Sequence, residues 1–151
     1  MSGRSLTLAL ADHALALRAE SGFDRLHDVM SPRISYLLAG DRRLMPYAGR
    51  FLGRTDTCVA FQALDVEFEM RDFEIGEMLA ENASAAVRWS AVWTNRGTRD
   101  KALIHGFSHL RFVDGLVSEW SDFIDTATAS YLAGWLPDMP AFAMAGPAGR
   151  G

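Results

Sequence analysis

Apolar residues in the first part of the chain recur with the period of a helix. Residues 6–20 are good helix formers and stop before Gly22. A second, short helix is predicted from residue 23 to a break at Ser31-Pro32, because Phe23, Leu26 and Met30 share one side of it. Residues 33–39 predict a short strand, and residues 40–53, which hold Pro46 and several glycines, predict a loop.

Beyond this loop the pattern predicts one more helix and then changes to strict alternation. The helix covers residues 55–68, with Thr55 or Asp56 as its cap and an apolar stripe that contains Cys58, Phe61, Leu64 and Phe68. Alternating segments follow at residues 73–79, 85–94, 102–112 and 116–125. Asp114-Gly115 between the last two is a strong hairpin signal, so these two strands are predicted to pair antiparallel.

This order of elements predicts an α+β domain in which a curved antiparallel sheet wraps around the N-terminal helices. Residues 126–136 are predicted to add a short helix. The predicted domain therefore spans residues 1–136, and residues 137–151 form a flexible tail rich in Pro, Gly and Ala.

Composition narrows the classes of function. The 151 residues suit one domain, and 15 basic residues against 19 acidic ones, without a basic run, disfavour nucleic-acid binding. No segment reaches the roughly 18 consecutive apolar residues of a membrane span. Cys58 is the single cysteine, so an intrachain disulfide and a Cys-based zinc site are excluded, and a reducing, cytoplasmic location is expected.

Two segments carry a resemblance to a known superfamily. The sequence FVDGLVSEWSDFID at residues 112–125 is similar to the last hairpin of SnoaL-like proteins, and PYAGRFLGR at residues 46–54 is similar to the loop before their third helix. The chain thus resembles the SnoaL-like, nuclear transport factor 2-like superfamily, which includes limonene epoxide hydrolase-like and ketosteroid isomerase-like proteins. The resemblance implies a cone-shaped barrel with a central apolar pocket, and a homodimer formed through the outer face of the sheet.

Asp122 is the principal candidate for chemistry. On the last strand Trp120, Asp122 and Ile124 share one face, and the resemblance places this face inside the pocket. A carboxylate beside Trp120 in an apolar pocket should have a raised pKa, which suits a general acid or base near neutral pH. The alternative is a structural Asp122 that pairs with Arg88 or caps a backbone group.

Comparison with the branches of the superfamily narrows the expected reaction. Arg88 matches the arginine of the epoxide hydrolases, but Ser90 stands where their first catalytic aspartate would be. The residues at the catalytic positions of ketosteroid isomerase are Ala14, Leu38 and Ser108, none of which retains the catalytic group. SnoaL-like polyketide cyclases use one aspartate on the last strand, which Asp122 matches, so deprotonation of a carbon acid is the expected chemistry.

Other residues complete the expected pocket. Tyr36 offers a hydroxyl donor or packs in the core, while Ser108, Ser90, Trp120, Ile124 and Phe61 are expected to contact the substrate. Whether Trp89 and Trp93 face the pocket or an interface depends on one residue of register, which the sequence leaves open.

A metal site is not expected at the two histidines of the fourth predicted strand segment. His105 and His109 point the same way on this strand with no third ligand evident, and they suit the dimer face better than a metal. No cofactor is needed for acid–base chemistry of this kind.

Two hypotheses follow. The first is a cofactor-independent cyclase, isomerase or hydrolase in which Asp122 is the acid or base and Arg88 orients a small apolar carbonyl compound. The second is a non-catalytic module that binds a small ligand or a second copy of itself.

Overall fold

A computed structural model describes residues 2–136, and it contains four helices and six strands in this part of the chain. The helices are α1 (Gly3–Ala19), α2 (Phe23–Val29), α3 (Arg54–Glu67) and α4 (Thr126–Ala133). The strands are β1 (Met30–Leu38), β2 (Gly49–Leu52), β3 (Phe68–Glu81), β4 (Ser84–Asn95), β5 (Lys101–Val113) and β6 (Leu116–Ile124). The predicted tail at residues 137–151 lies outside the described residues.

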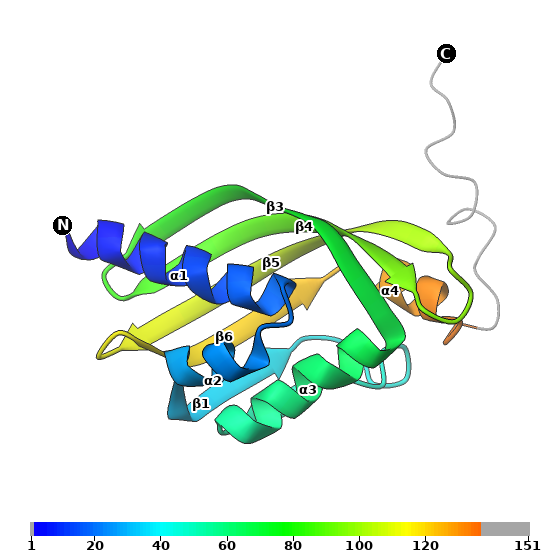
Figure 1. Ribbon diagram of the computed structural model, residues 1–151, viewed down its shortest axis with the longest axis horizontal. Coiled ribbons are helices and arrows are strands. Elements are labelled where there is room, and N and C mark those ends of the chain that lie inside the picture. The colour runs from blue at the N-terminus through cyan, green and yellow to red at the C-terminus, as the bar shows by residue number, and fades with distance from the viewer. Residues whose placement is uncertain (1, 137–151) are drawn as a thin grey trace, which may run out of the picture.

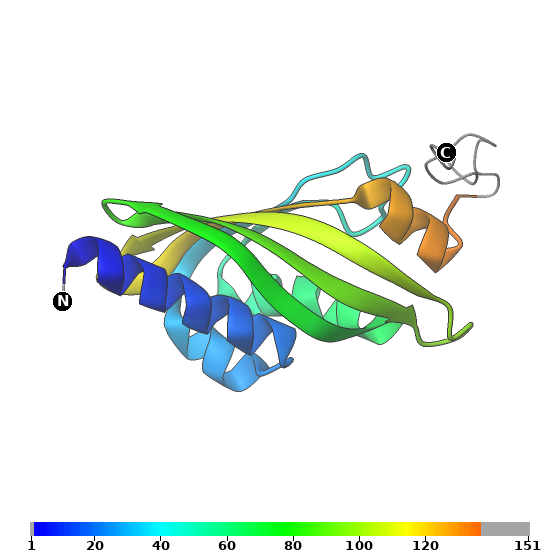
Figure 2. The ribbon, with the colours of Figure 1, turned by 90° about the horizontal axis from the view of Figure 1, so that it is seen from above.

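The strands form one six-stranded sheet in the order β2-β1-β6-β5-β4-β3. The sheet is strongly curved, and α1, α2 and α3 all lie on its concave side, as Figures 1 and 2 show. The ends β2 and β3 do not pair with each other, so the sheet remains unclosed. These features confirm the predicted α+β class, with a curved sheet around the N-terminal helices. One detail differs, because β1 runs parallel to β6 while all other pairs are antiparallel.

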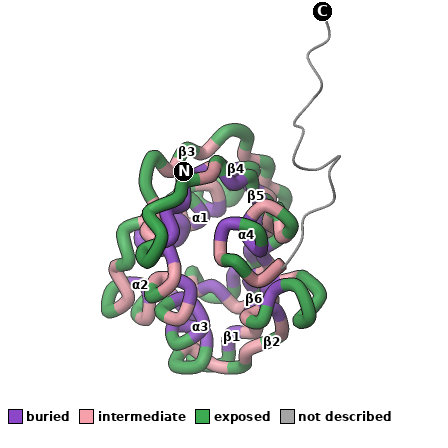
Figure 3. Tube along the Cα trace, turned by 90° about the vertical axis from the view of Figure 1, so that its right-hand side faces the viewer, coloured by how far each residue is buried: buried purple, intermediate pink, exposed green. Residues whose placement is uncertain are grey.

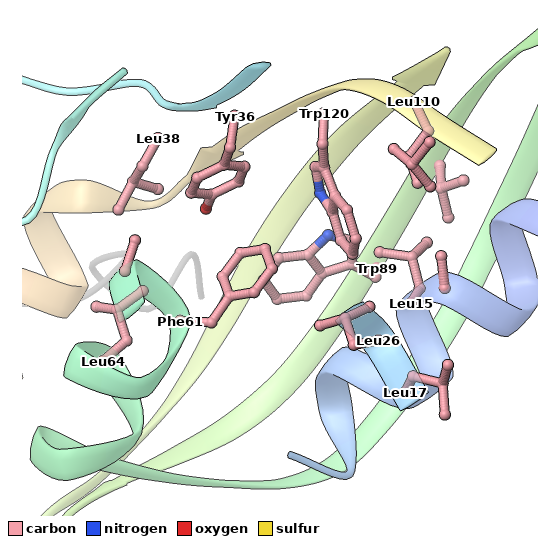
Figure 4. Close-up of a cluster of buried hydrophobic side chains, with 14 of the residues drawn as sticks. Leu15, Leu17, Leu26, Tyr36, Leu38, Phe61, Leu64, Trp89, Leu110 and Trp120 are labelled. Atoms are coloured by element: carbon pink, nitrogen blue, oxygen red, sulfur yellow. The ribbon is translucent and has the colours of Figure 1, made fainter. Parts of the chain in front are cut away.

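The hydrophobic core fills the space between the concave face and the helices. Figure 3 shows buried positions concentrated on the inward sides of the elements, and Figure 4 shows Phe61 of α3 pointing toward the sheet, where it packs against Tyr36 and Trp120. On β4 the burial alternates, with Val87, Trp89, Ala91 and Trp93 buried. The register that the sequence left open is therefore fixed: both tryptophans face inward.

The β5–β6 hairpin sets the register of the last strand. Asp114 and Gly115 both have positive φ, 52° and 77°, as a two-residue hairpin of this twist requires. A register shift follows between Arg111 and Phe112, after which Ser108 lies opposite Asp122. The turn and the shift together direct Asp122 to the concave face.

Two local predictions are wrong in part. Residues 49–52 form the edge strand β2 within the predicted loop, paired with residues 35–38 of β1. Ser31-Pro32 does not separate a helix from a strand, because both residues already belong to β1. Proline cannot donate a ladder hydrogen bond, and it lies where the β1–β6 register shifts between Met30 and Ser35. Within residues 2–136, no helix is long and apolar enough to cross a membrane.

Candidate functional site

A small cavity lies between the concave face of the sheet and helices α1 and α3. Its volume is about 30 Å³. It is lined by Leu15, Arg18, Tyr36, Leu38, Leu64, Met70, Phe73, Trp89, Trp93, Ser108, Trp120, Asp122 and Ile124. Most of these side chains are buried, whereas Met70 and Phe73 of the edge strand β3 and Ile124 of β6 are half-buried. The apolar wall with few polar groups is typical of a small-molecule pocket, and β3 is its least covered side.

Asp122 supplies a buried carboxylate to this cavity. It is 8% exposed and accepts three hydrogen bonds. Oδ1 accepts from Ser108 Oγ at 2.6 Å and from Trp120 Nε1 at 2.7 Å, and Oδ2 accepts from the Tyr36 hydroxyl at 2.8 Å. Burial raises the pKa of Asp122 above its ordinary value, although the three donors and the charge of Arg18 oppose this rise.

Tyr36 reaches Asp122 because β1 and β6 are neighbours. Their parallel register places Tyr36 beside Trp120 and Leu38 beside Asp122. The Tyr36 ring packs edge-on against Phe61 with 4.7 Å between centroids, which fixes its direction. Burial, and then the negative charge and hydrogen bond of Asp122, raise the pKa of the Tyr36 hydroxyl. The hydroxyl therefore stays protonated and remains a donor.

Trp89 extends the hydrogen-bond network to a fourth side chain. Its Nε1 donates to Ser108 Oγ at 2.8 Å, and Ser108 in turn donates to Asp122. The indole lies over Gly106, the residue opposite Trp89 on β5. A Cβ at position 106 would come within 2.2 Å of the Trp89 ring. Glycine at this position thus makes room for the indole that holds the Ser108 hydroxyl.

Arg18 is the cation of the cavity. It extends from α1 and pairs with Asp65 of α3 at 2.9 Å, with its side chain 10% exposed. Its guanidinium carbon lies 4.7 Å from the centre of the Phe61 ring. A planar guanidinium held between a carboxylate and an aromatic face has a fixed orientation. Arg18 thus brings fixed positive charge to the wall that also holds Asp122.

The structure brings together most of the residues predicted for the pocket. Tyr36, Ser108, Trp120 and Ile124 line the cavity with Asp122, and Phe61 packs directly against Tyr36 and Trp120.

Two predicted members are placed elsewhere. Arg88 is exposed and Ser90 half-buried, and both lie on the outer face of the sheet beside Glu74 and His105. Since Trp89 takes the inward position, strand alternation turns its neighbours outward. The prediction that Arg88 meets Asp122 in the pocket is therefore wrong, and so is the alternative of an Asp122–Arg88 pair.

The two histidines also lie outside the cavity. His105 is exposed and His109 half-buried, and they alternate with the buried Ser108 and Leu110 as predicted. In residues 2–136, no cluster of three or more His, Cys, Asp or Glu side chains is arranged to hold a metal ion.

Sequence reasoning missed Arg18 and Gly106 as members of the site, and it left open whether Trp93 faces the pocket. A signal for Arg18 existed, since it follows the buried Ala11, Ala14 and Leu15 at helical spacing and so continues the inward stripe of α1. No comparable signal marks Gly106, because its role depends on which face Trp89 occupies.

Comparisons with known proteins agree with this architecture. Neither a family model nor a curated protein matches the sequence. Solved structures do match. An NTF2-like protein of unknown function from Burkholderia pseudomallei has a TM-score of 0.77 at 15% identity, covering 88% of this chain and 98% of that one. AclR from Streptomyces galilaeus, a candidate hydroxylase, has a TM-score of 0.72 at 22% identity, covering 96% and 95%.

A candidate ketosteroid isomerase from Kribbella flavida has a TM-score of 0.64 at 23% identity, covering 82% of this chain and 81% of that one. Such identities establish the fold and leave the reaction open, since one fold hosts many activities. The curved sheet, the helices on its concave side and these matches together show that the chain has the cone-shaped fold of the SnoaL-like, nuclear transport factor 2-like superfamily.

Proposed function

We propose that the protein is a cofactor-independent enzyme in which Asp122 moves a proton to and from the carbon next to a carbonyl group of a small, largely apolar substrate. The observation that carries this proposal is a buried carboxylate with a raised pKa that lines an apolar cavity. A base with this environment is closer to neutrality than an exposed aspartate, and proton transfer is most efficient there.

The hydrogen bonds of Asp122 leave room for a substrate. An ionised carboxylate has about four lone-pair positions. Three of them accept from Ser108, Trp120 and Tyr36, two on Oδ1 and one on Oδ2. The remaining position belongs to Oδ2, the oxygen that we assign as the base. The donors on Oδ1 hold the carboxylate in one orientation while Oδ2 reacts.

The proposed step balances without a co-reactant. The C–H bond beside the carbonyl breaks, its proton passes to Oδ2 of Asp122, and the electron pair becomes an enolate with charge on the former carbonyl oxygen. Arg18, whose charge is held at the cavity wall, favours this anion electrostatically. Return of the proton from Asp122 to another carbon of the delocalised anion completes an isomerisation. In a cyclisation the enolate carbon instead attacks a second carbonyl carbon of the same molecule, and Asp122 gives its proton to the alkoxide oxygen that forms.

The apolar lining selects the class of substrate. Leucine, methionine and aromatic side chains form most of the wall, so a hydrocarbon or aromatic body is favoured over a charged one. The present volume of about 30 Å³ is smaller than such a body. We therefore propose that the half-buried Met70 and Phe73 of β3 move aside when the substrate enters.

The experiment requires no knowledge of the natural substrate. The ketone 1-indanone in D₂O exchanges the protons next to its carbonyl for deuterium, which proton NMR follows directly. We expect the protein to accelerate this exchange, and Asp122→Asn to reduce the acceleration by about 100-fold or more. The control is Glu119→Gln, the same chemical change on the same strand, at a side chain that is 53% exposed on the outer face. Equal exchange rates with the wild type and Asp122→Asn would refute the assignment of Asp122.

A second candidate function is supported by the small size of the cavity and the well-satisfied carboxylate. In this reading the protein binds a ligand without chemistry, and Asp122 is a structural anchor for Tyr36, Ser108 and Trp120. The two functions predict opposite changes in the free energy of unfolding of Asp122→Asn relative to the wild type. An amide that keeps the shape but removes a costly buried charge should stabilise the fold, whereas loss of a structural anchor should destabilise it.

A further inference from the structure

The side chain of Trp93 carries a buried hydrogen-bond donor that has no partner within residues 2–136. Among residues 2–136, the buried side-chain nitrogen and oxygen atoms without a partner are Trp93 Nε1 and Arg54 Nε. Trp93 is 3% exposed and lines the cavity, whereas Arg54 is not among the lining residues. Buried donors are nearly always paired in folded proteins, so a donor left free at a cavity indicates a group that the ligand supplies.

The other two tryptophans of the cavity show what the usual arrangement is. Trp89 Nε1 donates to Ser108 and Trp120 Nε1 donates to Asp122, each at less than 3 Å. Both indoles are therefore used by the protein itself. Trp93 shares the wall with them and packs at a tilt against Phe68, with 5.0 Å between ring centroids. Its N–H nevertheless has no partner in the described part of the chain.

The register of the sheet places Trp93 away from the reacting end. Asp122 lies opposite Ser108, and Ser108 lies opposite Val87. Trp93 is six residues further along β4 on the same inward face as Val87, so it lines another part of the same cavity. Its neighbour on β3 is Met70, one of the half-buried residues on the least covered side of the cavity.

We infer that Trp93 Nε1 is a specificity-determining donor that binds an oxygen acceptor of the substrate, remote from the carbon that Asp122 deprotonates. This assignment rests on the proposed function for the location of the reacting end. It narrows the substrate class to carbonyl compounds with an apolar body and a second uncharged oxygen, a ketone or an ether or hydroxyl oxygen, at the far end. A substrate without this oxygen leaves the Trp93 donor desolvated and unpaired, which weakens binding.

The test uses two ketones that differ only at the remote group: 5-acetyl-1-indanone, which has the second acceptor, and 5-isopropenyl-1-indanone, in which a CH₂ replaces that oxygen. Binding is followed by the indole N–H signals of ¹⁵N-labelled protein, and the Trp93→Phe variant assigns the Trp93 signal. We expect the acetyl compound to move the Trp93 signal downfield and to bind about tenfold more tightly than its partner. In Trp93→Phe the preference for the acetyl compound over the isopropenyl compound should disappear, so that the ratio of the two affinities falls to about one.

The outcomes separate this inference from the proposed function. Equal affinities of the two ketones for the wild type, or a Trp93 signal that stays fixed while the Trp89 and Trp120 signals move, overturn the role of Trp93 and leave the pocket in place. Absence of any shift with either ketone overturns it as well. If Trp93 causes a preference for the acetyl compound but the protein does not accelerate deuterium exchange, the inference on Trp93 stands and the catalytic role of Asp122 is rejected.

Discussion

Gly106→Ala should be among the most damaging small substitutions in this chain, although it adds a single methyl group. The new Cβ would meet three atoms of the Trp89 ring at 2.2, 2.3 and 2.6 Å, all well inside normal contact. The ring cannot remain over position 106, and its other neighbours are the Phe73 ring and the cavity that it lines. The substitution therefore displaces the indole and breaks its 2.8 Å hydrogen bond to Ser108.

The change in the free energy of unfolding of Gly106→Ala is the sum of two destabilising effects and one stabilising effect. Overpacking of a core by one methyl group costs about 1–3 kcal/mol, and a lost buried hydrogen bond costs about 1 kcal/mol more. Replacing glycine by alanine within a strand returns roughly 0.5–1 kcal/mol of backbone entropy. The net destabilisation is about 1–3 kcal/mol, which for a domain of this size lowers the melting temperature by roughly 3–10 °C.

Thermal unfolding followed by circular dichroism measures this change. A matched control is Gly3→Ala, where an added Cβ meets nothing within 4 Å. Trp89→Leu in the Gly106→Ala background tests the cause, because a smaller side chain at position 89 relieves the clash and the two losses should be strongly non-additive. A melting temperature of Gly106→Ala equal to or above that of the wild type would refute the steric argument.

Three further outcomes are expected. Burial raises the folded-state pKa of Asp122 above its unfolded value, so the contribution of Asp122 to the free energy of unfolding is highest below pH 3.8 and falls as the pH rises through the folded pKa. Asp122→Asn should remove this pH dependence in urea titrations and should melt a few degrees higher than the wild type near pH 7, whereas Glu119→Gln should do neither. Arg18→Met should lower the free energy of unfolding by about 2–4 kcal/mol in the same assay, since it leaves Asp65 without its cation, and Arg18→Lys should recover part of the loss. We also propose a homodimer formed through the outer sheet face, where Phe107 and Phe123 pair across strands and are 44% and 50% exposed. Analytical ultracentrifugation should find a dimer that Phe107→Asp converts to a monomer, and a monomeric wild type would contradict this proposal.

Much of the fold could be predicted because its signals are local. The apolar stripe of α3, the alternation on β4 and the Asp114-Gly115 turn each follow from a few neighbouring residues. The strand β2 could not be predicted in this way. Its four residues start with Gly49 and are followed by Gly53, and the adjacent apolar Phe51 and Leu52 hide the alternation of burial that the strand shows once it is formed. These residues become a strand because β1 offers an edge with which they pair. The parallel β1–β6 pair is equally non-local.

The residues of the site could be predicted only for strands on which the inward-facing positions were known. Alternation grouped Asp122 with Trp120 and Ile124, and the resemblance placed this face in the pocket, where the structure has it. Tyr36 was left open between a pocket donor and a core residue, and the structure makes it both buried and a donor to Asp122. On β4 both faces carry plausible residues, with tryptophans on one and Arg88 and Ser90 on the other. A shift of one residue exchanges these faces completely, so the resemblance alone could not decide between them.

Arg18, and not the predicted Arg88, supplies the positive charge of this cavity, and the positions of the two side chains explain why. An arginine on the concave face of β4 would occupy the space that Trp89 fills, and it would compete with the donors that already satisfy Asp122. An arginine on α1 approaches from the helix side, where Asp65 forms an ion pair with it and the Phe61 ring packs against its guanidinium group. The cavity thereby receives a cation that lowers the pKa of Asp122 without pairing with it directly. Because the opposing burial is the larger effect, the carboxylate keeps a raised pKa and one free lone pair, which are the two properties that proton transfer from carbon requires.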